Sequence, residues 1–161
     1  MSREIRAQPL TAADFSDFGD VLDTARGPDL LINDGLCGRH HDRAQLDFGD
    51  GRPGISLFDA VPRSLPYRFD LVERHPLGSQ AFVPMCLCSF LVIVAPDEAG
   101  RPGDPLAFLT APGQAVNFHR GTWHGVLTPL EAPGLFAVVD RIGEGENLEE
   151  VRYPVGWLVV E

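Results

Sequence analysis

The sequence predicts a mainly β protein, built as an antiparallel barrel or sandwich with one short helix near the N-terminus. Apolar segments of strand length follow one another through most of the chain, and the 17 glycines and 14 prolines are spread between them rather than pooled in a linker. No segment between them has the pattern of a crossover helix, which argues against a parallel sheet. Because the chain has 161 residues, 44% of them hydrophobic, we expect a single domain over residues 1–161.

Helical signals occur only near the two ends of the chain. In TAADFSDFGDVL (11–22), Thr11 is a good N-cap residue, Asp14 follows three positions later, and Gly19 provides a stop. Near the other end, ENLEEVRYP (146–154) predicts a helical turn before an extended C-terminus.

Strands are predicted through the middle of the chain, where clusters such as GRPG, HPLG and EAPG mark the turns. Their composition is rich in β-branched, aromatic and other apolar residues. The predicted strands are ISLFDA (55–60), YRFDLVERH (67–75), SQAFVPM (79–85), SFLVIVAP (89–96), LAFLTA (106–111), AVNFH (115–119), HGVLTPL (124–130) and LFAVVDRI (135–142).

The charge balance excludes two classes of partner. Arg and Lys together number 13 against 23 Asp and Glu, so the net charge of −10 repels nucleic acids and anionic membrane surfaces. No apolar run approaches the roughly 18 residues of a spanning helix, and MSREIRAQPL lacks the apolar centre of a signal peptide. We therefore expect a cytoplasmic protein with no nucleic-acid or membrane partner.

Three cysteines are present, an odd number. Cys86 and Cys88 belong to the apolar run MCLCSFLVIVA, where a thiol acts as a small hydrophobic side chain. We expect these two and Cys37 to be reduced core residues.

Polar residues gather at two places that could share one site. Along FDLVERH, the alternation of a strand puts Glu73 and His75 on one face, where a buried charge needs partners. Gln80 follows the next turn, and His124 follows a glycine turn further on. If these strands are neighbours, the four side chains can hold a divalent metal. They supply only one formal negative charge, so an alternative is that His75 and His124 bind substrate or transfer protons.

The stretch PGQAVNFHRGTWHG (112–125) concentrates polar groups between glycines. The alternation places Asn117 and His119 on one face of a strand that leads directly to Arg120. The segment predicts either one wall of an active-site pocket or a strand-turn-strand corner that is polar for structural reasons.

The spacing of these residues resembles the paired motifs of the cupin superfamily. The first motif, His-x-His followed by Glu, corresponds to Glu73-x-His75-x4-Gln80, and the second corresponds to Gly113-x5-His119-x-Gly121-x2-His124. Glu73 and Gln80 replace the usual His and Glu, and His119 replaces a Pro. This resemblance implies a cupin-like antiparallel β-barrel of the jelly-roll type.

A narrower resemblance covers nearly the whole chain. The blocks LINDGLCGRHHD (31–42), ERHPLGSQAFVPM (73–85), PGQAVNFHRGTWH (112–124) and VVDRIG (138–143) are similar to the ureidoglycolate lyase family of allantoin catabolism, also called ureidoglycolate hydrolase. The resemblance implies a homodimer that cleaves (S)-ureidoglycolate, a small anionic substrate, to glyoxylate and urea. It also implies a divalent metal, with nickel suggested, and no organic cofactor. The sequence departs from the family pattern at His40, at Cys86 to Cys88, and at Gly125 and Val126.

Cleavage of ureidoglycolate requires a cation for the carboxylate, a base near the hydroxyl and an acid near the leaving nitrogen. The candidate cations are Arg39, Arg120 and Arg141. The candidate acids and bases are Glu73, His75, His119 and His124, with Glu73 or His75 expected at the hydroxyl. The remaining candidates for substrate binding are Asn33, His41, Gln80, Asn117 and Asp140.

Structural roles are the alternative for several of these residues. Asp140 and Arg141 can form an internal ion pair, and the loop around His41 can be polar without touching substrate. Two other functions fit the same pocket: a non-catalytic module that binds a small carboxylate, and a related cupin isomerase, which should retain more of the His-x-His-Glu motif.

Overall fold

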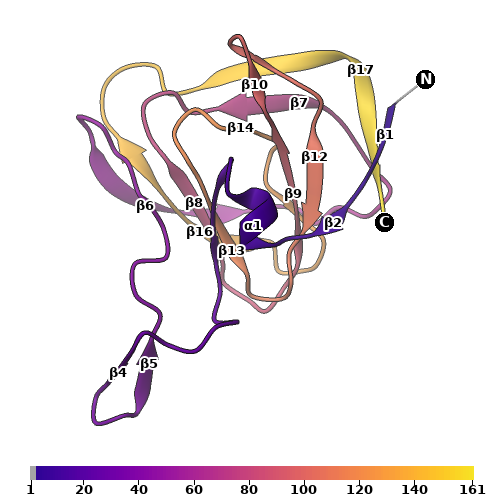
Figure 1. Cartoon of the computed structure of the whole chain (residues 1–161). Coiled ribbons are helices and arrows are strands. Elements are labelled where there is room, and N and C mark those ends of the chain that lie inside the picture. Colours follow the sequence, from indigo (N-terminus) through magenta and orange to yellow (C-terminus); the bar gives the residue numbers. More distant parts are fainter. Residues whose placement is uncertain (1–2) are drawn as a thin grey trace.

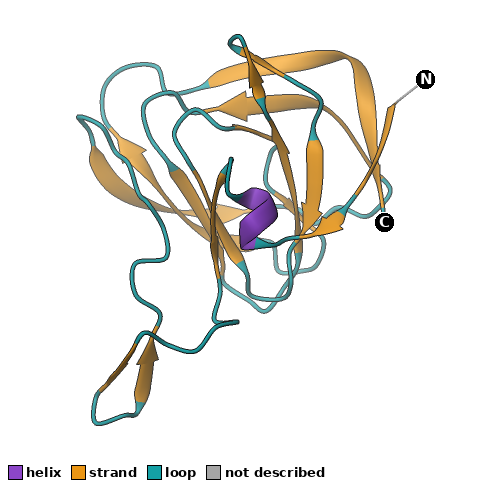
Figure 2. Ribbon diagram, viewed as in Figure 1, coloured by secondary structure: helices purple, strands orange, loops and turns teal. Residues whose placement is uncertain are grey.

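Two β-sheets face one another and form a nearly closed barrel (Figure 1). The computed structural model describes residues 3–161. Strands account for most of the regular structure, and the only helix among these residues is a single short one (Figure 2). The prediction of a mainly β, cupin-like barrel with a short N-terminal helix is therefore confirmed. No helix of residues 3–161 is long and apolar enough to cross a membrane.

The larger sheet has the order β1-β17-β7-β14-β9-β12-β2, with β15 also paired to β9. Its strands are β1 (Arg3–Arg6), β2 (Gln8–Pro9), β7 (Tyr67–Arg74), β9 (Phe90–Ala95), β12 (Leu106–Leu109), β14 (Trp123–His124), β15 (Thr128–Pro129) and β17 (Glu149–Val160). The smaller sheet has the order β3-β13-β8-β16-β6. Its strands are β3 (Gly19–Leu22), β6 (Arg52–Asp59), β8 (Gln80–Pro84), β13 (Ala115–Phe118) and β16 (Leu135–Ile142). Pairing is antiparallel except where β1 joins β17 and β2 joins β12.

The main core lies between the two sheets. Strand β9 is buried along its whole length because its two faces pack into different clusters. Val92 and Val94 pack into the space between the sheets, and Leu91 and Ile93 pack into a second cluster on the other face. Burial on both sides explains the continuous apolar sequence of this strand. Aromatic rings from both sheets complete the main core, among them Phe82, Phe108, Phe118 and Phe136.

The predicted N-cap is confirmed, but the helix is shorter than its sequence signals indicated. The side chain of Thr11 accepts a hydrogen bond from the backbone N–H of Asp14, and helix α1 spans only Ala12–Phe15. Strand β3 begins at Gly19, where a Cβ atom would lie 1.9 Å from the backbone oxygen of Asn117. The glycine thus allows the close approach of β3 to β13, rather than ending a longer helix.

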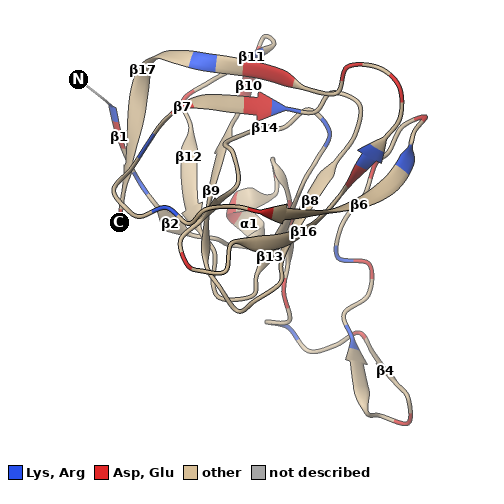
Figure 3. Cartoon of the chain, turned by 180° about the vertical axis from the view of Figure 1, so that it is seen from behind, with Lys and Arg blue, Asp and Glu red and all other residues tan. Residues whose placement is uncertain are grey.

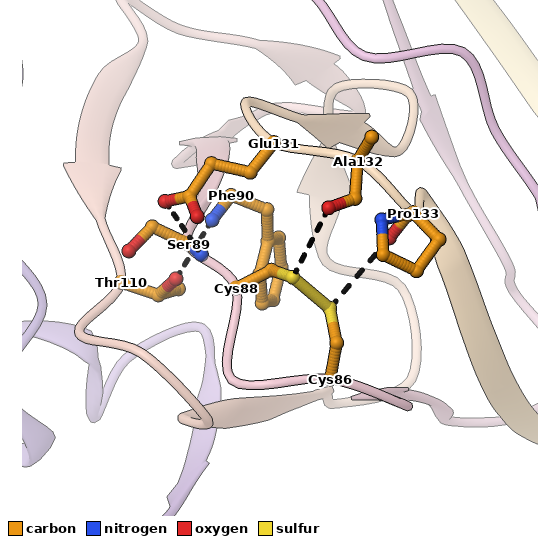
Figure 4. Close-up of a disulfide and its surroundings, with 8 residues drawn as sticks. All are labelled: Cys86, Cys88, Ser89, Phe90, Thr110, Glu131, Ala132 and Pro133. Atoms are coloured by element: carbon orange, nitrogen blue, oxygen red, sulfur yellow. Dashed lines mark hydrogen bonds between the residues drawn. A yellow bond between two sulfur atoms is a disulfide. The ribbon is translucent and has the colours of Figure 1, made fainter.

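Three expectations about local structure and cysteines are wrong. Residues 149–154 lie in strand β17 and not in a helical turn, because the segment pairs with β7 on one side. Cys86 and Cys88 form a disulfide in the turn between β8 and β9 (Figure 4). The apolar run that contains them enters the sheet only at Phe90, so the first part of the run is a turn. Cys37, which was also expected in the core, is a free thiol but is exposed, because both faces of β5 are open to solvent in the single chain.

Most predicted strands match β7, β8, β9, β12, β13 and β16 within two residues at each end. The prediction over 124–130 corresponds to two short pieces, β14 and β15, and β6 begins earlier than predicted. Small hairpins lie outside the two sheets: β10 (Asp97–Glu98) with β11 (Arg101–Pro102), and β4 (Leu30–Ile32) with β5 (Cys37–Arg39). The β4–β5 hairpin projects far from the barrel (Figure 1).

Candidate active site

A carboxylate and two imidazoles meet where β7 runs beside β14. Glu73 of β7 lies directly opposite His124 of β14, and His75 follows the end of β7. Potential ligand atoms of these three residues all lie within 4.8 Å of one another. The structure therefore brings together Glu73, His75 and His124, here called the triad.

Both histidines of the triad present a free ring nitrogen. Nδ1 of His75 is 2.7 Å from the backbone oxygen of Asn147, and Nδ1 of His124 is 2.9 Å from that of Gly125. Because a carbonyl oxygen only accepts, we assign the ring hydrogen of each neutral imidazole to Nδ1, and in that form Nε2 carries a lone pair. Both Nε2 atoms are buried and have no hydrogen-bond partner within residues 3–161. Two such imidazoles beside a carboxylate fit a divalent transition metal.

Burial shifts the pKa of two residues of the triad, His124 and Glu73. His124 is 1% exposed and stacks on Phe118 with 4.2 Å between ring centroids. Burial lowers the pKa of His124 to about 3, so the ring is neutral at physiological pH. Burial also raises the pKa of Glu73, an effect that His75 opposes and Glu150 reinforces. A carboxyl with a raised pKa exchanges protons more readily near neutral pH.

Gln80 and Asp140 lie on the inner face of the smaller sheet. Gln80 lies two residues before Phe82, whose ring is 6.4 Å from that of His124, so both side chains point into the barrel. Nε2 of Gln80 donates a hydrogen bond to a carboxylate oxygen of Asp140 at 3.1 Å. The amide oxygen of Gln80 is buried without a partner among the described residues. It is an oxygen donor that can turn toward a metal or substrate.

Asn117 and His119 lie on the opposite face of β13, away from the triad. Both side chains approach Asp20 of β3: Nδ2 of Asn117 donates at 3.0 Å, and Nε2 of His119 is 3.0 Å away. Burial alone raises the pKa of Asp20, but hydrogen bonds from Asn117 and the backbone of Gln45, together with His119, lower it below its usual value. This group forms a separate polar cluster that holds β3 on β13.

The predicted cations do not reach the triad within the same chain. Arg120 binds Asp47 at 2.7 Å, and the buried guanidinium of Arg141 binds Asp50 at 2.6 Å and the backbone oxygen of Glu144 at 3.0 Å. Asp140 and Arg141 therefore do not pair with each other, because neighbours on a strand point to opposite faces. The remaining candidates lie on the projecting hairpin and its flank and are exposed; they are Asn33, Arg39 and His41.

Asn147 is a residue of the site that the sequence did not reveal. Its backbone oxygen receives the hydrogen of His75, and its side-chain oxygen accepts from the backbone N–H of Leu77 at 2.8 Å. It thereby fixes the His75 ring and the turn that follows β7. The sequence analysis predicted a helical turn around Asn147, which hid its role beside His75. The only sequence feature that could have indicated a loop at the site was the polar, glycine-rich run GEGEN.

A hollow of about 350 Å³ is lined in part by residues that are close to His124 in the sequence. Trp123, Arg120 and Asp97 are among its lining residues, and no member of the triad is. Because Trp123 and His124 are consecutive residues of β14, they point to opposite faces. This hollow is therefore outside the barrel and does not belong to the site.

The fold and the triad together define the class of the protein. It is a small cupin-like barrel whose interior presents a carboxylate and two imidazoles, a donor set that could hold a metal ion or a small polar ligand.

Comparison with known proteins identifies the family. Residues 2–160 match the family model described as Ureidoglycolate lyase. Ureidoglycolate lyase of Rhodobacter capsulatus is 62% identical over 153 residues, which cover 94% of this chain and 95% of that protein. The protein of the same name from Chelativorans sp. is 51% identical, with 94% and 93% covered, and Ureidoglycolate lyase 2 of Rhizobium meliloti is 48% identical, with 89% of each covered. The chain belongs to the ureidoglycolate lyase family.

Replacing Asp20 with alanine should destabilise the fold in a pH-dependent way. Loss of hydrogen bonds to a partly buried carboxylate is expected to lower the free energy of unfolding by about 1.5–3 kcal/mol at pH 7. Because the pKa of Asp20 is lower in the folded than in the unfolded chain, its contribution is present above the unfolded pKa and is lost as the pH falls below about 4.

Urea unfolding of the wild type and Asp20→Ala at pH 7 and pH 3 measures this effect. Asp17→Ala is the matched control, because Asp17 is exposed in the same region. A difference between wild type and Asp20→Ala that stays the same at both pH values would contradict the prediction.

Proposed function

We propose that this chain catalyses the cleavage of (S)-ureidoglycolate to glyoxylate and urea, a carbon–nitrogen lyase reaction of allantoin and purine catabolism. The observation that carries the proposal is the triad inside a barrel whose sequence belongs to the ureidoglycolate lyase family. A non-catalytic carboxylate-binding module and a cupin isomerase are less well supported, because the relatives carry the name ureidoglycolate lyase.

The triad matches the proton transfers of this reaction. The substrate hydroxyl gives its proton to a base, the O–H electron pair forms the aldehyde C=O, and the C–N electron pair leaves with the urea nitrogen, which takes up a proton. No water is consumed. Glu73 is our candidate for the base at the hydroxyl, because its raised pKa also lets it return a proton to nitrogen. His75 stands beside it, and neutral His124 acts as an acceptor or ligand.

We further propose that the site takes a divalent metal, with nickel suggested by the family resemblance. The free Nε2 atoms of His75 and His124, one oxygen of Glu73 and the amide oxygen of Gln80 would hold it. A bound ion would supply Lewis acidity toward an oxygen of the substrate. A carboxylate has two oxygens, so Glu73 can bind the ion and still accept a proton.

The remaining proposals concern the state of the protein. It acts as a single domain, in the cytoplasm, and as a homodimer, without an organic cofactor. Exposed apolar side chains on the outer face of β6, including Ile55 at 75% and Leu57 at 64% exposure, support assembly. The net charge of −10 supports the absence of nucleic-acid and membrane partners.

Turnover of ureidoglycolate tests the proposed function. Purified protein should release glyoxylate and urea in equal amounts, faster than the spontaneous decay of the substrate. Urea and ammonia are both measured, because hydrolysis of the ureido group would release ammonia instead. Binding of substrate without acceleration would favour the carboxylate-binding module, and ammonia release would contradict lyase chemistry.

Nickel should stabilise the metal-free protein through the triad. At a free Ni²⁺ concentration about 100 times its Kd, one-site binding raises the free energy of unfolding by about 2.7 kcal/mol. In a chain of this size this corresponds to a rise in Tm of about 5–10 °C. Thermal unfolding with and without Ni²⁺ measures the shift, which should disappear in a His75→Ala, His124→Ala double variant.

His40→Ala is the matched control for this experiment, because His40 lies outside the triad. The control should keep the full shift. An equal shift in the double variant would show that nickel binds elsewhere.

A further inference from the structure

The projecting hairpin exposes apolar side chains to solvent. Residues 29–41 form this hairpin and are here called the arm. Two hydrogen bonds join its two ends: the backbone N–H of Asp29 donates to the backbone oxygen of Arg39, and the backbone N–H of His41 donates to the carboxylate of Asp29. Leu31 is 68% exposed and Leu36 is 89% exposed. A two-stranded hairpin without cover is at best marginally stable in water, so this conformation requires a surface to pack against.

The amount of exposed surface indicates that the missing cover is large. A compact monomer of 17.6 kDa exposes about 7,900 Å². This chain exposes 9050 Å². The excess of about 1,100 Å² exceeds the roughly 800 Å² that each partner buries in a stable protein–protein interface.

Among residues 3–161, no arginine forms an ion pair or a hydrogen bond with the triad, so no cation for the substrate carboxylate is identified there. The sequence contains no lysine, so any such cation is an arginine. Arg74 is next to Glu73 in sequence, but its guanidinium lies 4.4 Å from the ring centroid of Trp123 and binds Asp97 and Glu149. The other arginines adjacent to site residues are held by Asp47 and Asp50, as described above.

Arg39 is different. It ends β5 near the base of the arm, where Figure 3 shows basic positions at and beside the hairpin, and its side chain is exposed and forms no hydrogen bond or ion pair with residues 3–161. Arg39 pairs with Leu30 near the base of the hairpin. Because the whole arm projects from the barrel (Figure 1), its base lies on a surface that a neighbouring molecule can cover.

A complementary surface borders the triad. The segment 142–148 contains Asn147, which fixes His75, and it exposes Ile142 at 39% and Leu148 at 50%. It also contains the exposed carboxylates Glu144 and Glu146. The edge of the site therefore offers apolar side chains that can pack against the leucines of an arm. It also carries negative charge that attracts the arginine of an arm.

We propose that the arm of one copy packs on segment 142–148 of a second copy and places Arg39 beside that copy's triad, where it binds the substrate carboxylate. The arrangement is reciprocal, so a two-fold dimer buries both arms and completes both sites. Arg is suited to this role because it binds a carboxylate through two parallel hydrogen bonds. The assignment of Arg39 to substrate rests on the proposed function, whereas the docking of the arm does not.

Photo-crosslinking from Cys37 tests the docking independently of activity. Cys37 is exposed on the arm, and Cys86 and Cys88 are paired, so a benzophenone maleimide attaches at this position alone. In a mixture of ¹⁴N- and ¹⁵N-labelled chains, irradiation should give covalent dimers that join residue 37 of one isotope to segment 142–148 of the other. Cross-links within one chain, or to another face of the second chain, would overturn the proposal.

Mixing two impaired variants tests the role of Arg39. Arg39→Ala is expected to lower kcat/KM by about 10- to 150-fold, mainly through KM. When Arg39→Ala and Glu73→Gln chains are refolded together in equal amounts, half of the dimers are mixed and each has one intact site, so about a quarter of wild-type activity should return. If Arg39 served its own chain, the activity of the mixture would stay at the residual level of the Arg39→Ala chains, and the proposal would be overturned.

Arg26→Ala is the matched control, because Arg26 is an exposed arginine that precedes the arm. It should keep wild-type activity by itself. A wild type without lyase activity would refute the proposed function and the role of Arg39 in it, and the cross-linking result would still decide whether the arm docks on a second copy.

Discussion

Replacing Glu73 with glutamine is expected to lower kcat for ureidoglycolate cleavage by about 10²- to 10⁴-fold, the range of general acid–base catalysis. Glutamine keeps the size and the hydrogen-bonding capacity of the side chain but cannot take up the hydroxyl proton. Because Glu73 is only partly buried and its pKa is raised by burial, removing its charge should not destabilise the fold. Steady-state release of glyoxylate, at saturating Ni²⁺, measures the effect.

Glu150→Gln is the matched control for this variant. Glu150 lies opposite Glu73 on β17 and is an exposed carboxylate. It raises the pKa of Glu73 but does not belong to the triad, so its removal should change kcat by less than about threefold. Equal effects of the two substitutions would indicate that only the local negative charge matters, and a fully active Glu73→Gln would assign proton transfer to another group.

Alternation and turn residues were sufficient to predict the barrel strands. Strand β16 matches its predicted range, 135–142, because buried Phe136 and Val138 alternate with less buried neighbours and glycine and proline precede it. The convergence of Glu73, His75 and His124 was predicted only on the condition that their strands are neighbours, and the pairing of β7 with β14 meets this condition. Local patterns therefore predict the strands and their faces, whereas the pairing that brings the triad together is a long-range contact.

Other elements depend on contacts that a sequence does not display. The arm has no alternating pattern, because both of its faces are exposed in the single chain. Strand β17 has polar residues at its start because that part lies on the surface, and its pairing with β7 overrides a weak helical pattern.

The roles of the arginines were also beyond sequence reasoning. Arg120 and Arg141 stand inside family blocks, but their ion-pair partners, Asp47 and Asp50, come from a loop more than 70 residues earlier in the chain. These distant carboxylates determine where the guanidinium groups of Arg120 and Arg141 point. Spacing along the chain therefore identifies the triad but not the cation that completes it.

Replacing Phe118 with alanine should destabilise the barrel and disturb the triad at the same time. Phe118 is 6% exposed, stacks on His124, and lies 5.8 Å from Phe82 and 6.0 Å from Phe15 between ring centroids. Truncating a core phenylalanine costs about 3–5 kcal/mol, because the lost burial is added to the cost of the cavity. Urea unfolding measures this loss, and calorimetric titration with Ni²⁺ measures the effect on the metal site.

A second substitution separates the two roles of this ring. Phe118→Leu retains most of the apolar volume but removes the stacking on His124, so the expected loss of stability falls to about 1–2 kcal/mol. Val155→Ala, an exposed strand position, should change stability by less than about 0.5 kcal/mol. If the flat face of Phe118 orients the His124 ring, Phe118→Leu weakens Ni²⁺ binding more than its stability loss alone explains. If nickel affinity follows stability across the three variants, the ring serves only as core, and His124 is held by its Nδ1 hydrogen bond to Gly125.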